Sequence, residues 1–394
     1  MRTDDNYRMR ILSAVAISFV VLGHINFYAA GHMDVTLTEP LTFQGWFPYY
    51  SFHLPLFLFI SGYFFRDLPE GNPLLREVLR FAGKKAVKLL LPYYIFSGLS
   101  LLLTSWLQTR GFPYWDSFSL TAWLVSPWTE PFLITFSTPV WYLTALFIAE
   151  IFLMILRTVL RKLFRSSLAR ETVLLAITLA AGIAAVYFNE TAAPSGTAVV
   201  YLRSVVMLFF IQAGILYRRH LEKHDKLKNR WYFLIVFGVQ FLLILLSGND
   251  SLNPGLFALV DFGKTGFAYF IGGVTGIMLW LRISTIAASL PRQSRVVSFI
   301  GKNTKYIMAL HIFSWFLLNA LLNLLHAQNP KLFITSGFSS RWYHSFLYYC
   351  NTSNPRMILL YFAAGMALPL GIAWAVQAIS RLLRRTASKP RLPA

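Results

Sequence analysis

The sequence predicts an all-α membrane protein, because of its composition, the length of its apolar runs and the placement of its charges. Of its 394 residues, 56% are hydrophobic and only 13% are charged, whereas soluble domains carry about 25% charged residues. The mean hydropathy of +0.54 excludes a disordered chain, which needs low hydrophobicity. The single cysteine, Cys350, cannot form an internal disulfide, so a disulfide-stabilised secreted domain is excluded too.

Ten apolar runs are each about long enough to cross a hydrocarbon core of ~30 Å at a rise of ~1.5 Å per residue. They lie near residues 11–30, 46–65, 89–107, 139–156, 172–188, 199–217, 231–247, 256–281, 306–325 and 357–378. The first run is too long for the ~7–15 apolar residues of a secretory signal peptide, so we expect it to remain as a helix. Residues 1–394 are therefore predicted to form a single membrane domain, with ten spans within 11–378 and a short basic tail over 379–394.

The basic residues predict the orientation of these spans. Thirty of the 36 lysines and arginines lie before the first span, in the even-numbered loops or after the last span. Because positive charge accumulates on the cytoplasmic side, both termini are predicted to be cytoplasmic. The net charge of +20 is thus explained by topology and by contact with membrane lipid, and no nucleic-acid partner is expected.

Ionisable side chains inside a membrane are costly and therefore suggest function. Seven lie within the predicted spans, namely His24, His53, Glu150, Arg203, Asp261, Lys264 and His311. Helix rise puts His24 roughly 20 Å from the cytoplasmic boundary and His53 roughly 10 Å from the outer one, which is the same level in a ~30 Å core. Arg203 falls in the outer part of the membrane, and His311 falls nearer the cytoplasm. We therefore expect a polar cavity in the outer half, with His311 between it and the cytoplasm.

Each of these residues also has a purely structural explanation. Asp261 and Lys264 are three positions apart, so they can pair on one helix face, and Glu150 can bond to a neighbouring helix. His53 can satisfy backbone carbonyls that the nearby proline leaves without a donor. For His24, the only ionisable group in its span, the explanations are a helix–helix hydrogen bond or a role in catalysis or transport.

The chemistry open to these groups is limited. The sequence has no paired cysteines or His-x-x-x-His spacing for a metal, no glycine-rich phosphate loop and no Gly-x-Ser-x-Gly elbow, so no metal is expected. Histidine accepts a proton near neutral pH, which favours proton abstraction or an acyl-imidazole intermediate. On the cytoplasmic side, Lys85 and Lys88 share a helix face and suit a phosphorylated ligand.

Five motifs, in order, resemble the membrane-bound acyltransferase-3 family, which includes bacterial polysaccharide O-acetyltransferases. They are the helix from Arg10 to Gly23-His24, Phe52-His53-Leu54-Pro55 with Ser61-Gly62-Tyr63, Lys85-x-x-Lys88 before Pro92-Tyr93, Pro139-Val140-Trp141-Tyr142-Leu143, and Ile300-Gly301-Lys302-Asn303-Thr304 running to His311. The second motif is closest to the fucose 4-O-acetylase-like branch. Family members commonly carry Arg or Lys eleven positions before the first-helix histidine, where this chain has Ser13. Arg10 is expected to substitute for that cation by snorkelling.

The resemblance implies transfer of an acyl group, usually acetyl, from cytosolic acyl-CoA to a sugar hydroxyl on the outer side of the bacterial inner membrane. His24 would be the catalytic residue, as a general base or as a transient acyl carrier. Lys85, Lys88 and Arg10 would bind the acetyl-CoA donor. We expect the carbohydrate acceptor to be bound by His53, Arg203, Trp141, Tyr142 and His311. The depth and charge of Arg203 also suit the oxyanion, and an interfacial aromatic belt is the alternative explanation for Trp141 and Tyr142.

Two other classes of protein remain open from the sequence. A transporter or flippase would use the same polar groups to bind and move a sugar or a lipid-linked substrate. Such proteins commonly show repeated halves, and we detect no internal repeat in this sequence. A membrane scaffold with little activity is the third class, and it stays open because Ser13 replaces the basic residue of the family.

Overall fold

A computed structural model describes residues 3–29, 46–67, 74–112, 116–248, 255–256, 259–260, 262, 266–329 and 356–387. Within these residues every regular element is a helix, apart from an isolated β-bridge between Gly255 and Val260. Nine helical segments of this part of the chain are long and apolar enough to cross a membrane. The predicted all-α membrane fold is therefore confirmed, and nine of the ten predicted spans each overlap one of these segments.

The helices fall into two groups by length. The long ones are α1 (Thr3–Ala29), α5 (Leu91–Gln108), α8 (Trp141–Leu163), α9 (Ser167–Ala192), α10 (Gly196–Leu216), α11 (Asn229–Ser247), α12 (Phe267–Ala288), α14 (Thr304–Gln328) and α15 (Arg356–Ala387). The shorter ones are α3 (Tyr49–Tyr63), α4 (Leu74–Lys85), the π-helix η2 (Ala86–Leu90), α6 (Leu120–Leu124), α7 (Ser126–Thr129), the 3-10 helix η3 (Thr138–Val140), the π-helix η4 (Tyr217–Leu221), the 3-10 helix η5 (Glu222–His224) and α13 (Arg295–Lys302).

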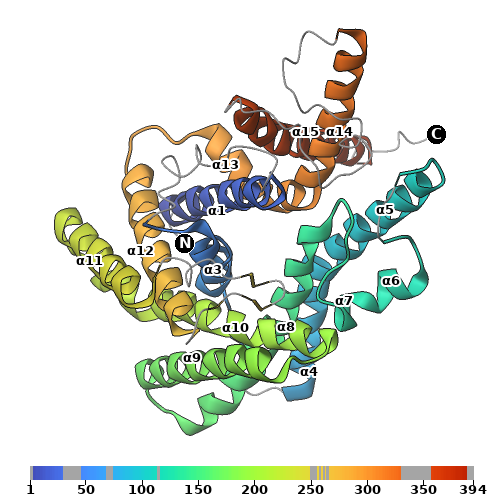
Figure 1. Ribbon diagram of the computed structural model, residues 1–394. Coiled ribbons are helices and arrows are strands. Elements are labelled where there is room, and N and C mark those ends of the chain that lie inside the picture. Colours follow the sequence, from blue (N-terminus) through green and yellow to red (C-terminus); the bar gives the residue numbers. More distant parts are fainter. Residues whose placement is uncertain are drawn as a thin grey trace, which may run out of the picture.

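The tenth predicted span, near 46–65, corresponds to the short helix α3. It has 15 residues, or roughly 22 Å of length, which is less than the ~30 Å thickness of the hydrocarbon core. In Figure 1 α3 lies in the middle of the bundle, where α1, α10 and α12 pack against it. Ten of its residues are buried. Because protein surrounds α3, it does not have to cross the full apolar thickness by itself.

Two glycines bring α3 and α10 into backbone contact. A β-carbon added at Gly62 would stand 1.9 Å from the carbonyl oxygen of Ile211, and one added at Gly214 would stand 2.1 Å from the carbonyl oxygen of Phe59. No other residue fits at either position without moving a helix. Such small residues are typical of closely packed helices in membranes.

The predicted boundary of the eighth span is wrong. The sequence placed this span near 256–281, but α12 begins at Phe267 and ends at Ala288. Gly266, just before the helix, has a φ of 60°. This is a left-handed conformation, which suits glycine and is not that of an α-helix. Asp261 and Lys264, which were expected to pair on one face of this span, precede the helix and lie outside the described residues.

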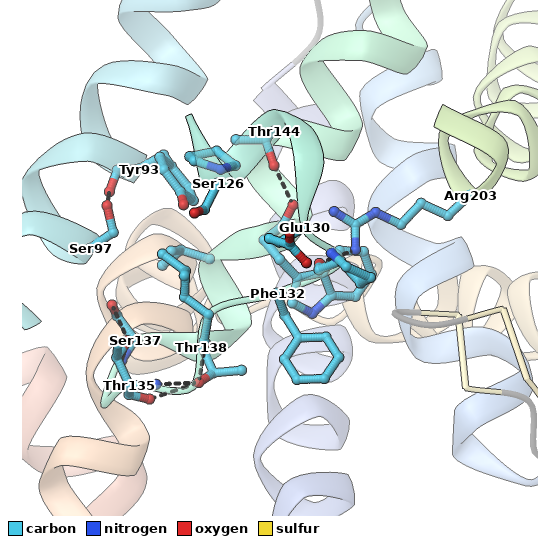
Figure 2. Close-up of a pocket in the computed structure, with 15 residues that line it drawn as sticks. Tyr93, Ser97, Ser126, Glu130, Phe132, Thr135, Ser137, Thr138, Thr144 and Arg203 are labelled. Carbon is cyan, nitrogen blue, oxygen red and sulfur yellow. Dashed lines mark hydrogen bonds between the residues drawn. The ribbon is translucent and has the colours of Figure 1, made fainter. Parts of the chain in front are cut away.

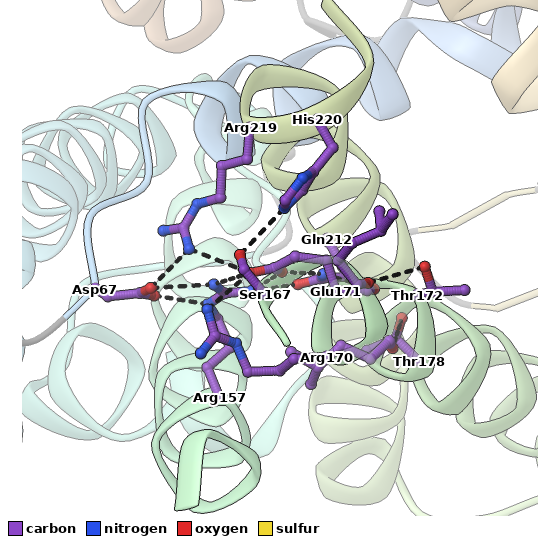
Figure 3. A network of polar contacts seen from close by, with 12 residues as sticks. Asp67, Arg157, Ser167, Arg170, Glu171, Thr172, Thr178, Gln212, Arg219 and His220 are labelled. Carbon is purple, nitrogen blue, oxygen red and sulfur yellow. Dashed lines mark hydrogen bonds and ion pairs between the residues drawn. The ribbon is translucent and has the colours of Figure 1, made fainter. Parts of the chain in front are cut away.

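An ion-pair network, formed by Asp67, Arg157, Glu171, Gln212 and Arg219, ties the chain after α3 to α8, α9, α10 and η4 (Figure 3). Arg157 donates to both carboxyl oxygens of Asp67, at 2.8 and 3.2 Å, and of Glu171, at 2.6 and 2.8 Å. Arg219 reaches the same two carboxylates, and Gln212 bonds to Arg157 and Glu171. Burial raises the pKa of Asp67, but the hydrogen bonds and charges of the two arginines outweigh this and hold that pKa well below its usual range.

Candidate functional site

Two histidines from distant parts of the sequence meet inside the bundle. Nδ1 of His24, on α1, lies 2.7 Å from Nε2 of His311, on α14, and the rings are nearly parallel, at 4°. The expectation that His311 lies below His24, toward the cytoplasm, is therefore wrong. Helix rise gives a residue's distance along its own helix, whereas packing against neighbouring helices sets the level and tilt of that helix.

The hydrogen bonds around this pair assign the protons. Nδ1 of His311 lies 2.8 Å from the carbonyl oxygen of Ile307, and because a carbonyl only accepts, this nitrogen carries a proton. In the neutral pair, Nε2 of His311 is then the acceptor and Nδ1 of His24 the donor. This tautomer places the lone pair of His24 on Nε2, the nitrogen that does not face His311.

His24 lines a cavity of about 60 Å³ between α1, α3 and the start of α8, which we call the histidine cavity. His53, Trp141, Tyr142 and Met308 also line it, and it has room for roughly four water molecules. His24 and His53, which were predicted to lie at the same level, line the same cavity. His311 is fully buried, so it reaches the cavity only through His24.

Two further side chains of the histidine cavity carry polar groups. His53 is 4% exposed, and its Nδ1 donates to the carbonyl of Tyr49 at 2.5 Å. This carbonyl is not the one that Pro55 leaves without a donor, which belongs to Ser51. The hydroxyl of Tyr142 is buried and has no hydrogen-bond partner within the described part of the chain.

Arg203 lies in a second cavity, of about 10 Å³. Figure 2 shows its side chain extending from α10 toward Glu130. The guanidinium donates to the carbonyl of Pro131, and its carbon lies 4.6 Å from the centroid of the Trp141 ring. Trp141 lines both cavities. The structure thus brings Arg203 against Trp141 but does not place it in the cavity of His24.

On the predicted cytoplasmic side, Lys85 is paired within the protein. Its Nζ lies 2.7 Å from Oε1 of Glu150, and the same oxygen accepts from the hydroxyl of Ser61 at 2.5 Å. Glu150 is only 1% exposed. The expectation that Glu150 bonds to a neighbouring helix is confirmed, and in this conformation it compensates the charge of Lys85.

Lys88 has a neighbour that the sequence analysis did not identify. Because Pro92 has no N–H, the carbonyl of Lys88 loses its helical donor, and Nζ of Lys305 donates to that carbonyl at 2.8 Å. The turn between Lys85 and Pro92 is the π-helix η2, a form that is frequent at functional sites. Pro92 was the sequence signal that an outside donor is needed here, although it gave no sign that Lys305 supplies it.

The side chain of Arg10, on α1, reaches α13, where its Nη1 donates to the hydroxyl of Ser298 at 3.0 Å. Ser13 donates to the carbonyl of Met9 on its own helix at 2.8 Å. Position 13 therefore supplies no charge, and Arg10 is the cation of α1 nearest to it.

The histidine cavity is suited to proton transfer. The lone pair on Nε2 of His24 can accept a proton, while His311 accepts from the other nitrogen and fixes the ring. Among the residues that the structure describes, no group of three or more histidine, cysteine, aspartate or glutamate side chains is placed to hold a metal ion.

Comparison with known proteins points to one family. The model of the acyltransferase-3 family, described as an acyltransferase domain, matches residues 6–376. No curated protein and no solved structure matches the chain. The matched range covers α1 through α14 and most of α15, so it includes both cavities and the lysines of the predicted cytoplasmic side.

Proposed function

The chain belongs to the acyltransferase-3 family, and on this premise we propose that it moves an acyl group, acetyl in the first instance, from cytosolic acyl-CoA to a hydroxyl of a cell-envelope carbohydrate. The acceptor lies on the outer side of the bacterial inner membrane. The observation that carries this proposal is the 2.7 Å hydrogen bond between His24 and His311 beside the histidine cavity. This bond leaves His24 with a lone pair that can take a proton from an alcohol.

Nε2 of His24 is the general base. It accepts the proton of the acceptor hydroxyl while the oxygen attacks the carbonyl carbon of the thioester. The tetrahedral intermediate then collapses as the carbon–sulfur bond breaks, and the thiolate of CoA takes the proton back from the imidazolium. His311 acts as a positioning residue, because its Nε2 holds the ring of His24 in the tautomer that the reaction needs.

The other polar groups of the histidine cavity have separate roles. The Tyr142 hydroxyl is available to donate to the oxyanion of the tetrahedral intermediate, since it has no partner in the described part of the chain. His53 uses Nδ1 to donate to Tyr49, so its Nε2 can accept from the acceptor hydroxyl. Trp141, with Arg203 behind its ring, offers an aromatic surface to the sugar.

The phosphates of the donor bind at the exposed lysines Lys88 and Lys305, with Arg10 on the neighbouring helix. Met308, one turn after Lys305 on α14, lines the histidine cavity. Roughly 5 Å of helix therefore separates Lys305 from the part of α14 that lines this cavity. Lys85 contributes less, because Glu150 already compensates its charge. Lysine supplies charge without bidentate geometry, so the phosphate contacts are less directional than with arginine.

The proposal is tested by incubating reconstituted protein with acetyl-CoA labelled in the acetyl group and with envelope carbohydrate. His24→Ala should lower transfer by about 10²–10⁴-fold, the usual contribution of a general base. His220→Ala is the matched control, since this half-buried histidine lies outside the histidine cavity and bonds only to Ser167, at 3.2 Å, among the contacts described. Transfer that survives in His24→Ala would contradict the assignment. Acetyl label retained on the protein would indicate an acyl-histidine intermediate instead of direct transfer. Transport of carbohydrate that carries no label would favour a transporter.

A further inference from the structure

Two apolar cavities lie away from the candidate site, on the side where α11 stands at the edge of the bundle (Figure 1). One, of about 400 Å³, adjoins the end of α10, and the other, of about 210 Å³, lies between α11 and α12. Both are lined by Phe209, Val274 and Met278, so they adjoin each other along α12. We call the two together the α10–α12 slot, and α9 and α11 form its sides.

The dimensions of the α10–α12 slot suit a single hydrocarbon chain. It follows α12 from Leu281 to Phe267, which is roughly 21 Å of helix and therefore longer than one leaflet of a ~30 Å core. An extended acyl chain matches that length.

The acidic groups at the wide end of the slot are already compensated. Asp225, which lines this end, accepts from Tyr217 at 3.1 Å and pairs with Arg282. Glu222, three residues earlier, pairs with Arg8 and Arg218. No free carboxylate of these two is left to repel an anion.

The basic groups at the same end are not compensated. Lys223, Lys226, Lys228 and Arg230 are all exposed, and none of them forms an ion pair with another described residue. The predicted orientation puts them at the cytoplasmic surface, where anionic headgroups lie. The preference of basic loops for that side explains their charge, but it does not explain an apolar slot of acyl-chain length beside them.

We infer that the α10–α12 slot binds one acyl chain of an anionic glycerophospholipid of the cytoplasmic leaflet, whose phosphate lies against the basic residues of segment 223–230. The wide end receives the glycerol region next to Tyr217 and His224, and the narrower end receives the terminal methyl near Phe267. This lipid site is separate from the histidine cavity, and its existence does not depend on the proposed reaction.

The test is native mass spectrometry of the full chain, delipidated in detergent and titrated with phosphatidylglycerol or phosphatidylcholine. The wild type should bind one phosphatidylglycerol at least about tenfold more tightly than phosphatidylcholine. Val274→Phe, which fills the shared part of the slot, should remove this binding. Leu246→Phe, at a residue of α11 that is 78% exposed and lines neither cavity, is the matched control and should bind as the wild type does.

A triple variant, Lys226→Gln, Lys228→Gln and Arg230→Gln, separates the headgroup from the chain. It should reduce phosphatidylglycerol binding to the level of phosphatidylcholine and leave the latter unchanged. Ala213→Leu, which narrows only the larger cavity, serves as a second filling variant if Val274→Phe does not fold. Equal binding of the two lipids by the wild type, or unchanged binding in the filling variants, would overturn the inference. So would a filling variant that converts an oligomer to monomers without losing lipid, because a second copy would then cover the slot.

Discussion

The ion-pair network and the histidine pair are both polar clusters inside an apolar bundle, but they differ in their hydrogen bonding and in the volume of the cavity beside them. In the network all four oxygens of Asp67 and Glu171 accept from arginine or glutamine, and the cavity beside Arg157 has only about 10 Å³. His24 is hydrogen-bonded to His311 and lines a cavity of about 60 Å³. Buried charges are tolerated when fully paired, whereas a neutral ring can keep a lone pair for a reactant. Saturated polar groups therefore indicate a structural role, and a lone pair beside a cavity indicates chemistry.

The largest expected effect belongs to the network and concerns stability. Arg157→Met leaves the buried carboxylate of Glu171 and the partly buried one of Asp67 short of a partner, so it should lower the free energy of unfolding by about 3–5 kcal/mol. Unfolding can be followed in detergent by titration with sodium dodecyl sulfate. The double variant Arg157→Met/Glu171→Leu should recover much of the loss, because it removes both partners. A single variant as stable as the wild type would show that the network is not structural.

The next effect belongs to the histidine cavity and concerns rate. Tyr142→Phe removes only a hydroxyl, and it should lower kcat by about 10²–10³-fold, as for the loss of one oxyanion donor, with little change in KM for acyl-CoA. The measurement is steady-state transfer with the reconstituted protein. An unfolding midpoint equal to that of the wild type is the control. An unchanged kcat would remove the assigned role of Tyr142.

A smaller effect on kcat should follow from changing His311, which is hydrogen-bonded to the general base His24. His311→Phe cannot accept from His24, and it should lower kcat by roughly 10–100-fold, as changes to residues that orient a reactive group commonly do. His311→Gln keeps an acceptor for His24 and a donor for Ile307, so it should restore part of the rate. Equal rates in the two variants would indicate that His311 only fills space.

The smallest effect is the pH dependence of the network. Because the folded protein holds the pKa of Asp67 well below its usual range, the carboxylate stabilises the fold fully above the unfolded pKa of about 3.9, and this contribution is lost as pH falls below that value. At pH 7 Asp67→Asn should be less stable than the wild type by on the order of 1–2 kcal/mol. The difference in stability should be constant from pH 7 down to about pH 5 and should narrow below the unfolded pKa of about 3.9, so a difference that is unchanged at pH 3 would contradict the assignment.

Local geometry along each helix could be read from the sequence. The rise per residue predicted that His24 and His53 lie at one level, and the two line the same cavity. The ten apolar runs were found because hydropathy is also a local property. Hydropathy did not show that α3 is only 15 residues long or that α12 begins only at Phe267.

Contacts between helices could not be read in the same way. His24 and His311 are 287 positions apart, and Lys85 and Glu150 are 65 apart, so only packing decides which side chains meet. For this reason the sequence put His311 too low and left Lys85 free for the donor. The sequence also could not show that Trp141 lies between Arg203 and the histidine cavity, because depth along a helix does not give the direction in which a side chain points.

The backbone contact between α3 and α10 also restricts how reactants can be brought together. With the carbonyls of Phe59 and Ile211 set against Gly214 and Gly62, neither helix can slide along the other unless the seam first opens. A sliding movement of α3 that would carry His53 from one side of the membrane to the other is therefore blocked. α3 and α10 therefore form one rigid pair, and under the proposed function the acceptor must travel to His53 rather than be carried by it.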